Sequence, residues 1–308
     1  MHMAIRSTTL PIGGLLLLML AAPACVDIVG ADLKYVEREE KRFPTTARPQ
    51  VTLGTFDGPI EIRPWDRQEV LVVIEKRAIN KDGVVPIVVR AEQSGDRITV
   101  DVTAPKNEGL NLFGVNGRSA KLIVSLPAAS DVTAKSGDGS IDVESLTGKM
   151  DLRSGDGSIH GRWLHGDVNA HTGDGSIRLD GVDGALTVDT GDGSIRVTGK
   201  LTALRARSGD GSMTIRAEGG STAAGDWDIT TGDGSVTLEI PDGFNGELDA
   251  HTGDGGVHVN DVTLTDTSTS GDEERHSRRK NSVRGRLGSG GKSVRIRTGD
   301  GSITLRRS

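Results

Sequence analysis

The stretch that decides the fold is residues 136–207, which reads SGDGSIDVESLTGKMDLR (136–153), SGDGSIHGRWLHGDVNAH (154–171), TGDGSIRLDGVDGALTVD (172–189) and TGDGSIRVTGKLTALRAR (190–207). These are four consecutive 18-residue units, and each begins with Ser or Thr followed by Gly-Asp-Gly-Ser-Ile. A fixed period of this kind is typical of repeat proteins, in which each unit buries its apolar side chains against its neighbours.

The same turn motif, [ST]-G-D-G-[SG]-[IMV], extends beyond this stretch and occurs eight times. The first five copies keep the 18-residue period and the later copies are spaced more widely, so the array starts strictly and then takes insertions. The longest insertion holds the polar sequence TDTSTSGDEERHSRRKN (265–281), which we expect to be a solvated loop. The eight aspartates of the motif are Asp138, Asp156, Asp174, Asp192, Asp210, Asp233, Asp254 and Asp300.

Apolar residues alternate on both sides of each turn. The positions four and two before the leading Ser or Thr, and five and seven after it, are apolar in 31 of 32 cases, with Gly161 the exception. This alternation predicts two short strands per unit, each with one buried face. Because the inward positions change parity across the turn, the chain must bend there, and we expect Gly137 and Gly139 to supply positive φ at that corner. Gly148, Gly166 and Gly184 mark a second bend.

The fold class that follows is all-β: a β-solenoid, or β-helix-like repeat domain, with an aliphatic interior. Residues 51–78, 87–104 and 121–127 before the repeats also read as strands, so an irregular β-rich part precedes the array. The pattern leaves the handedness open, and it also leaves open a stack of antiparallel hairpins.

The high glycine content reflects the repeated Gly-Asp-Gly turn. Glycine accounts for 43 of the 308 residues, and 16 of these lie in the eight Gly-Asp-Gly turns. Only eight residues are aromatic, which argues against a core anchored by large rings. The formal net charge is −6, so no basic field indicates a nucleic acid as partner.

The N-terminal residues predict export. Residues 1–24 have the features of a signal peptide, with Arg6 ahead of an apolar run from residue 10 to residue 22 that is too short to span a bilayer. Cys25, the only cysteine, follows the expected cleavage site directly and is the candidate lipid attachment residue of a lipoprotein. The alternative is plain cleavage that leaves a free thiol. We expect residues 25–49 to be a tether and residues 50–307 to be the repeat domain.

Two features together resemble a known family. The repeated [ST]-G-D-G-S-I turns follow an export signal, and the chain closes on VRGRLGSGGKSVRIRTGDGSITLR (283–306). In these features residues 50–307 resemble the bacterial putative adhesin family, whose members are built from β-strand repeats. The resemblance implies an exported β-helix-like domain with a role at the cell surface, and it carries no catalytic residues to transfer.

The motif aspartates are the most informative polar set. If the units stack, these carboxylates form a column with neighbours about 5 Å apart, and such close like charges repel. Either a cation such as calcium bridges them, or backbone N–H groups of the glycine corners hold each charge, which we favour. We expect no cofactor, no metal-binding residues and no catalytic residues. We interpret His160, His165, His171, His251 and His258 as solvated strand residues.

These observations favour a non-catalytic exported protein of the cell envelope or surface, in the periplasm or outside the cell, that binds a polymer or protein partner not identified by the sequence. Contact with a membrane is expected only through a lipid anchor at Cys25. One alternative is a structural spacer or an accessory lipoprotein of envelope stress. A carbohydrate-active enzyme on a β-helix is a weaker alternative, because the strict 18-residue units leave little loop from which to build a catalytic groove.

Overall fold

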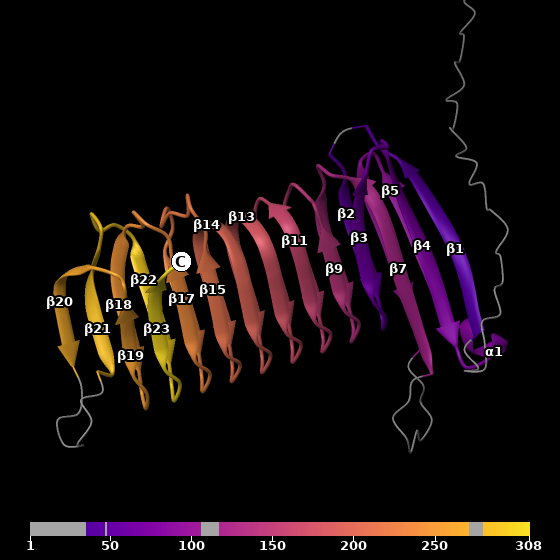
Figure 1. Ribbon diagram of the computed structural model, residues 1–308. Helices are drawn as coiled ribbons and strands as arrows, with labels where there is room; N and C mark the ends of the chain where they lie inside the picture. Colours follow the sequence, from indigo (N-terminus) through magenta and orange to yellow (C-terminus); the bar gives the residue numbers. More distant parts are fainter. Residues whose placement is uncertain (1–34, 47, 106–116, 271–279) are drawn as a thin grey trace, which may run out of the picture.

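The computed structural model describes residues 35–46, 48–105, 117–270 and 280–308. Its regular structure is almost entirely β, as the sequence predicts, and the one helix in these residues is α1 (Lys81–Val84). The strands stand side by side in a long array (Figure 1). Within the described residues, no helix has the length and apolar character needed to cross a membrane.

The array has two layers of strands, and β13 and β14 run from one layer into the other. One rung consists of a strand in each layer. In the repeats the two strands are joined by the Gly-Asp-Gly turn, which we call the first corner, and the bend that leads to the next rung is the second corner. The first layer contains β2 (Gln50–Thr55), β6 (Arg97–Thr103), β8 (Asp131–Ser136), β10 (Met150–Ser154), β12 (Val168–Thr172), the later parts of β13 (Ile177–Thr190) and β14 (Ile195–Ser208), β16 (Trp227–Thr231), β18 (Gly246–Thr252) and β22 (Ser293–Thr298). The second layer contains β3 (Ile60–Trp65), β7 (Arg118–Pro127), β9 (Ile141–Glu144), β11 (Ile159–His165), the earlier parts of β13 and β14, β15 (Met213–Ala217), β17 (Val236–Ile240), β19 (Val257–Asn260) and β23 (Ile303–Arg307).

Neighbouring rungs pair in parallel and in register with the sequence repeat. Met150 lies opposite Val168, and Val168 lies opposite Leu186, so each residue meets its counterpart in the next repeat. Residues that occupy the same position in the repeat therefore stack in columns along the array. This parallel pairing establishes the solenoid and excludes a stack of antiparallel hairpins.

The interior is the aliphatic core that the alternation predicts. Every one of the 32 aligned inward positions is buried except Val259, which is half-buried. Burying each large aliphatic side chain stabilises the fold by about 1.5–3 kcal/mol. Gly161 is buried at an inward position, and a Cβ there would lie 2.7 Å from side-chain carbons of both Leu164 and Leu179. The missing side chain at Gly161 thus leaves room for its leucine neighbours.

The order of the rungs in space differs from their order in the chain at both ends. The last repeat, β22 and β23, lies between the rung of β16 and β17 and the rung of β18 and β19. The rung of β2 and β3 likewise lies between β6 and β7 on one side and β8 and β9 on the other. The chain therefore inserts its first and last rungs into the interior of the array.

Antiparallel strands complete the two ends. At the N-terminal end, β1 (Tyr35–Pro44) pairs with β4 (Glu69–Ala78), β4 pairs with β7, and β5 (Val88–Ser94) pairs with β6. At the other end, β21 (Ser282–Leu287) pairs with β18, and β20 (Leu264–Ser270) pairs with β21. Part of the expected tether (25–49) is thus an edge strand, and the expected polar loop (265–281) begins as one.

The two corners need glycine for different reasons, which corrects the expectation of positive φ at Gly137 and Gly139. These residues do not have positive φ, and a Cβ on either would lie 2.0 Å from a carbonyl oxygen of the preceding rung. Close stacking of the rungs therefore requires glycine at the first corner. At the second corner, Gly166 and Gly184 do have positive φ, of 119° and 148°, which glycine adopts most readily.

Candidate functional site

The leading Ser or Thr of each motif joins one rung to the next at the first corner. The Thr172 hydroxyl donates a hydrogen bond of 2.8 Å to the carbonyl oxygen of Gly157, one rung away. The same bond, to the second glycine of the adjacent turn, recurs along the array at Ser136, Ser154, Thr190, Ser208, Thr231, Thr252 and Thr298. The motif thus begins with Ser or Thr because a hydroxyl at this position satisfies a backbone carbonyl of the neighbouring rung.

The corner aspartates point into solvent beside this ladder. Asp138, Asp156 and Asp174 are exposed, and each carboxylate lies over the first glycine of the next turn. A Cβ on Gly155, for example, would lie 2.9 Å from Oδ1 of Asp138. The carboxylates therefore follow one another along the outer edge of the array.

Backbone N–H groups do not hold these charges, contrary to the explanation that the sequence favoured. Among the described residues, none of the eight corner carboxylates accepts a hydrogen bond from a backbone N–H. The N–H of Gly139 instead donates to the Ser136 hydroxyl at 3.0 Å, and the N–H of Gly157 donates to the Ser154 hydroxyl at 3.1 Å. In these turns the Ser hydroxyl, and not the aspartate, accepts the hydrogen bond from the second glycine.

A further aspartate, Asp57, lies next to the N-terminal end of the column. It occupies a degenerate turn, where it is half-buried and within reach of the charge of Asp138. Burial raises the pKa of Asp57, and the negative charge of Asp138 raises it further. No group of three or more His, Cys, Asp or Glu side chains is arranged to hold a metal ion in the part of the chain that the structure describes.

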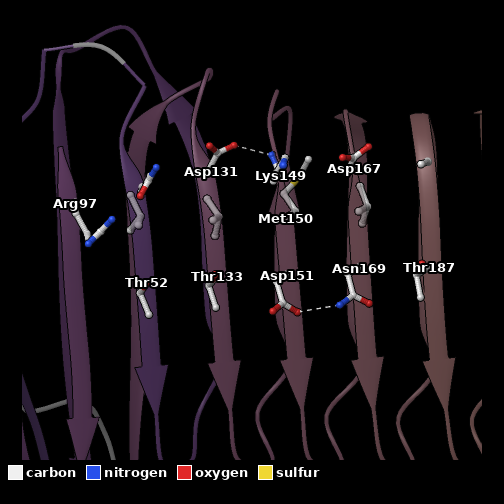
Figure 2. Close-up of a pocket in the computed structure, with 15 residues that line it drawn as sticks. Thr52, Arg97, Asp131, Thr133, Lys149, Met150, Asp151, Asp167, Asn169 and Thr187 are labelled. Atoms are coloured by element: carbon white, nitrogen blue, oxygen red, sulfur yellow. Dashed lines mark hydrogen bonds between the residues drawn. The ribbon is translucent and has the colours of Figure 1, made fainter.

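A groove of about 530 Å³ crosses the outer face of the first layer over β2, β8, β10, β12 and β13. Figure 2 shows a row of side chains that runs across its floor from strand to strand. Because the strands are in register, the side chains of this row are spaced by about 4.8 Å. The row consists of Thr52, Thr133, Asp151, Asn169 and Thr187.

Hydrogen bonds hold two carboxylates of the groove, those of Asp131 and Asp151, in place. The backbone N–H of Lys149 donates to the Asp131 carboxylate at 2.7 Å, and Nε of Arg48 donates to the same carboxylate at 3.1 Å. Burial alone would raise the pKa of Asp131, but these hydrogen bonds and the positive charges outweigh it, so the pKa lies below its ordinary value. In the floor, the Asn169 amide donates to the Asp151 carboxylate at 3.3 Å.

Other polar groups of the groove have no partner within the described residues. The Asp167 carboxylate, beside β12, and the Arg97 guanidinium, on β6, are separated by several strands (Figure 2), and neither side chain makes a hydrogen bond or ion pair within the described residues. They leave a charged acceptor and a charged donor available to a ligand. The arrangement can bind a polar molecule along the row, and its residues do not form a nucleophile with an adjacent base.

The histidines are exposed strand residues, as expected, and three of them face an aspartate on an adjacent rung. Nδ1 of His160 lies 3.2 Å from Oδ1 of Asp142, and Nδ1 of His171 lies 3.3 Å from Oδ1 of Asp189. His165 makes the corresponding longer contact with Asp183. Sequence reasoning missed these partners, although each carboxylate lies one repeat length from its histidine along the chain.

The candidate lipid attachment residue, Cys25, and the signal peptide predicted over residues 1–24 lie outside the described residues. Both stay predictions.

Parallel rungs in two layers, a hydroxyl ladder at one corner and polar grooves across flat outer faces define the class: an all-β repeat protein of the solenoid type. The chain belongs to the Toastrack DUF4097 family, whose match covers residues 51–306. This match confirms the family resemblance that the repeated turns indicated. No curated protein matches the chain.

Several solved structures are similar over most of their length. A putative adhesin from Bacteroides fragilis has 12% sequence identity and a TM-score of 0.42, covering 87% of this chain and 96% of its own. A putative lipid binding protein from Parabacteroides distasonis has 12% identity and a TM-score of 0.36, covering 88% and 96%. A putative cell adhesion protein from Clostridium sporogenes has 13% identity and a TM-score of 0.30, covering 89% and 100%.

Proposed function

We propose that this protein is a non-catalytic, exported protein of the bacterial envelope or surface that binds a polymer or protein partner on the outer faces of its solenoid. The observation that carries the proposal is the row of hydrogen-bonding side chains across the first-layer groove, in register over five strands. An extended partner with repeated polar groups can contact several members of such a row at once. The predicted leader and Cys25 support export.

The regular strands also explain why binding is favoured over catalysis. From residue 131 to residue 208, each rung presents its outward side chains at fixed spacing, and the corners are closed by short turns rather than by long loops. Such a surface offers many similar contacts instead of one enclosed cavity in which water is excluded from a reaction.

Binding can be tested by cosedimentation of the full chain with purified bacterial envelope material. A triple variant of the first-layer row, Asp151→Ala, Asn169→Ala and Thr187→Ala, is expected to reduce the bound fraction. The matched control replaces three threonines that form an equivalent outward row in the second layer, Thr214, Thr237 and Thr304, by alanine. The binding function is contradicted if the unmodified chain stays in the supernatant. A triple variant that binds like the unmodified chain excludes the row as the contact.

The location can be tested separately. Cells that express the full chain are labelled with a palmitate analogue and then treated with an external protease. Label that is present on the unmodified chain and absent from Cys25→Ala supports the lipid anchor, and proteolysis of intact cells places the protein on the surface. A chain that stays in the cytosol contradicts export.

A further inference from the structure

Trp163 is exposed on the second layer in a backbone conformation that bulky residues rarely adopt. Its φ is 53°, in the left-handed region, and 54% of its surface is exposed. A large side chain is disfavoured in this conformation because its Cβ approaches the carbonyl oxygen. Strained residues of this kind persist where the surrounding structure holds them, often at functional sites.

The neighbouring rungs show that the strained backbone belongs to the repeat and the ring does not. Ser145 and Gly181 lie one repeat before and one repeat after Trp163, and they have φ of 54° and 75°. A small residue therefore satisfies this position elsewhere in the array. The indole adds no buried core to the fold, so its presence calls for another explanation.

The indole is held against its neighbours. A Cβ on Gly181 would lie 3.0 Å from Cδ1 of Trp163, so the glycine gives the ring room on the next rung. The Arg162 guanidinium lies 5.8 Å from the ring centroid, within the range of a cation–π contact. The ring is thus positioned as a small apolar platform at the surface.

A polar groove lies beside this platform. It has a volume of about 500 Å³ and crosses β3, β9, β11 and β13, with Arg162 in its wall. Nε of Arg178 donates to the Asp180 carboxylate at 2.9 Å, and Nη2 of Arg162 donates to the Glu144 carboxylate at 3.3 Å. These exposed groups keep further hydrogen-bonding capacity for a ligand.

The surroundings decide the class of ligand. The other exposed large hydrophobic side chains of the described residues, Ile79, Val85 and Val88, lie around α1 and β5 at the N-terminal end, away from β11 (Figure 1). A protein partner generally needs several apolar anchors that are buried together. One ring bordered by carboxylates and guanidinium groups instead suits a molecule with a single apolar face and many hydroxyls.

We propose that Trp163 and the adjacent second-layer groove bind a pyranose unit of a polysaccharide. The C–H face of the sugar stacks on the indole, and its hydroxyls hydrogen-bond to Arg162, Arg178 and Asp180. The inference rests on the proposed function, because it names a glycan as the polymer that the solenoid binds.

Two glycan probes test the proposal with the full chain: cosedimentation with purified peptidoglycan and fluorescence titration with chitotetraose. Trp163→Gly is expected to weaken binding, to whichever of the two probes the unmodified chain binds, by about tenfold or more, as loss of a central aromatic anchor does. Trp163→Phe is expected to keep part of the affinity. Ser145→Gly is the matched control, because it changes the same repeat position where no ring is present, and it is expected to bind like the unmodified chain.

Folding is monitored in the same variants. Glycine adopts positive φ without strain, so Trp163→Gly is expected to melt no lower than the unmodified chain. The proposal is overturned if neither probe binds, or if Trp163→Gly binds as well as the unmodified chain. Binding of the unmodified chain to envelope material but to neither glycan overturns this inference alone, whereas absence of all binding overturns the proposed function as well.

Discussion

The hydroxyl of Thr190 donates a hydrogen bond of 2.8 Å to the carbonyl oxygen of Gly175 on the adjacent rung. Both residues are buried there, so no water replaces this donor if it is removed. The repeated Ser or Thr at the first corner therefore stabilises the stacking of adjacent rungs and does not form a ligand site.

Thr190→Val removes the donor and keeps the shape of the side chain. We expect the free energy of unfolding to fall by about 1–3 kcal/mol, because a buried carbonyl loses its partner. Urea unfolding followed by circular dichroism measures the change. Thr187→Val on the same strand, where the side chain is exposed, is the control and should change stability by no more than about 0.5 kcal/mol. Equal effects of the two changes would contradict the role of the hydroxyl ladder.

Gly173→Ala tests the close stacking of the first corner. The new Cβ would lie 2.6 Å from the carbonyl oxygen of Gly155, so the rungs must separate locally. We expect a loss of about 1–3 kcal/mol, as for overpacking of an interior. Gly219→Ala is the control, since no atom lies within 4 Å of a Cβ at that site. An unchanged thermal midpoint for Gly173→Ala would contradict the requirement for glycine at the first corner.

The repeat, the buried positions and the register can be predicted from the sequence because two features of its pattern set them. Alternation of apolar residues fixes which side chains face inward, and the 18-residue period fixes which of them meet, as for Met150 and Val168. The partners of the histidines follow from the same period, although single-residue inspection missed them.

The order of the rungs could not be predicted in the same way. All rungs have aliphatic residues at the same inward positions and similar corners. Trp227 therefore packs between Leu204 on one side and Val294 on the other, although Val294 is far away in the chain. Nothing in the local pattern of 293–307 distinguishes an interior rung from a terminal one. The positive φ of Trp163 could not be predicted either, because Trp163 lies between the paired residues Arg162 and Leu164 and nothing in the alternation marks this break in the pairing.

The corner carboxylates are expected to repel one another. Asp174→Asn removes one charge from the exposed column, so we expect a higher thermal midpoint at low salt. The difference should shrink as the Debye length falls from about 30 Å at 0.01 M to about 3 Å at 1 M salt. Asp66→Asn, at an exposed site outside the column, is the control. A lower midpoint for Asp174→Asn, together with stabilisation of the unmodified chain by calcium, would instead indicate a bridging cation.

Asp57 gives the column a pH dependence. Burial and the charge of Asp138 raise the pKa of Asp57 above its ordinary value of 3.8, so the folded protein holds this proton more tightly than the unfolded chain does. Its contribution to stability is present at pH values below the unfolded pKa and is lost as the pH rises through the folded pKa. Asp57→Asn should therefore stabilise the protein at neutral pH and have little effect below the ordinary value.

The pKa of Asp57 can be followed directly by NMR titration of its carboxyl carbon. Asp138→Asn removes the neighbouring charge and should shift that pKa downward, leaving only the effect of burial. An unchanged pKa of Asp57 in Asp138→Asn would contradict repulsion between the two carboxylates.

Asp131→Asn should act in the opposite sense to Asp57→Asn. It should destabilise the protein at neutral pH, because the pKa of Asp131 is lowered in the folded state.

Removal of residues 293–308 tests the order of the rungs. These residues include β22 and β23, which pair with β16 and β17 on one side and with β18 and β19 on the other. Their loss leaves the strands of residues 246–287 without their link to the array, because each rung buries its core only against its neighbours. Hydrogen exchange should therefore show rapid exchange in β18, β19, β20 and β21, while residues 131–208 stay protected. If the last repeat were instead a terminal rung, residues 246–260 would keep their protection in the shortened chain.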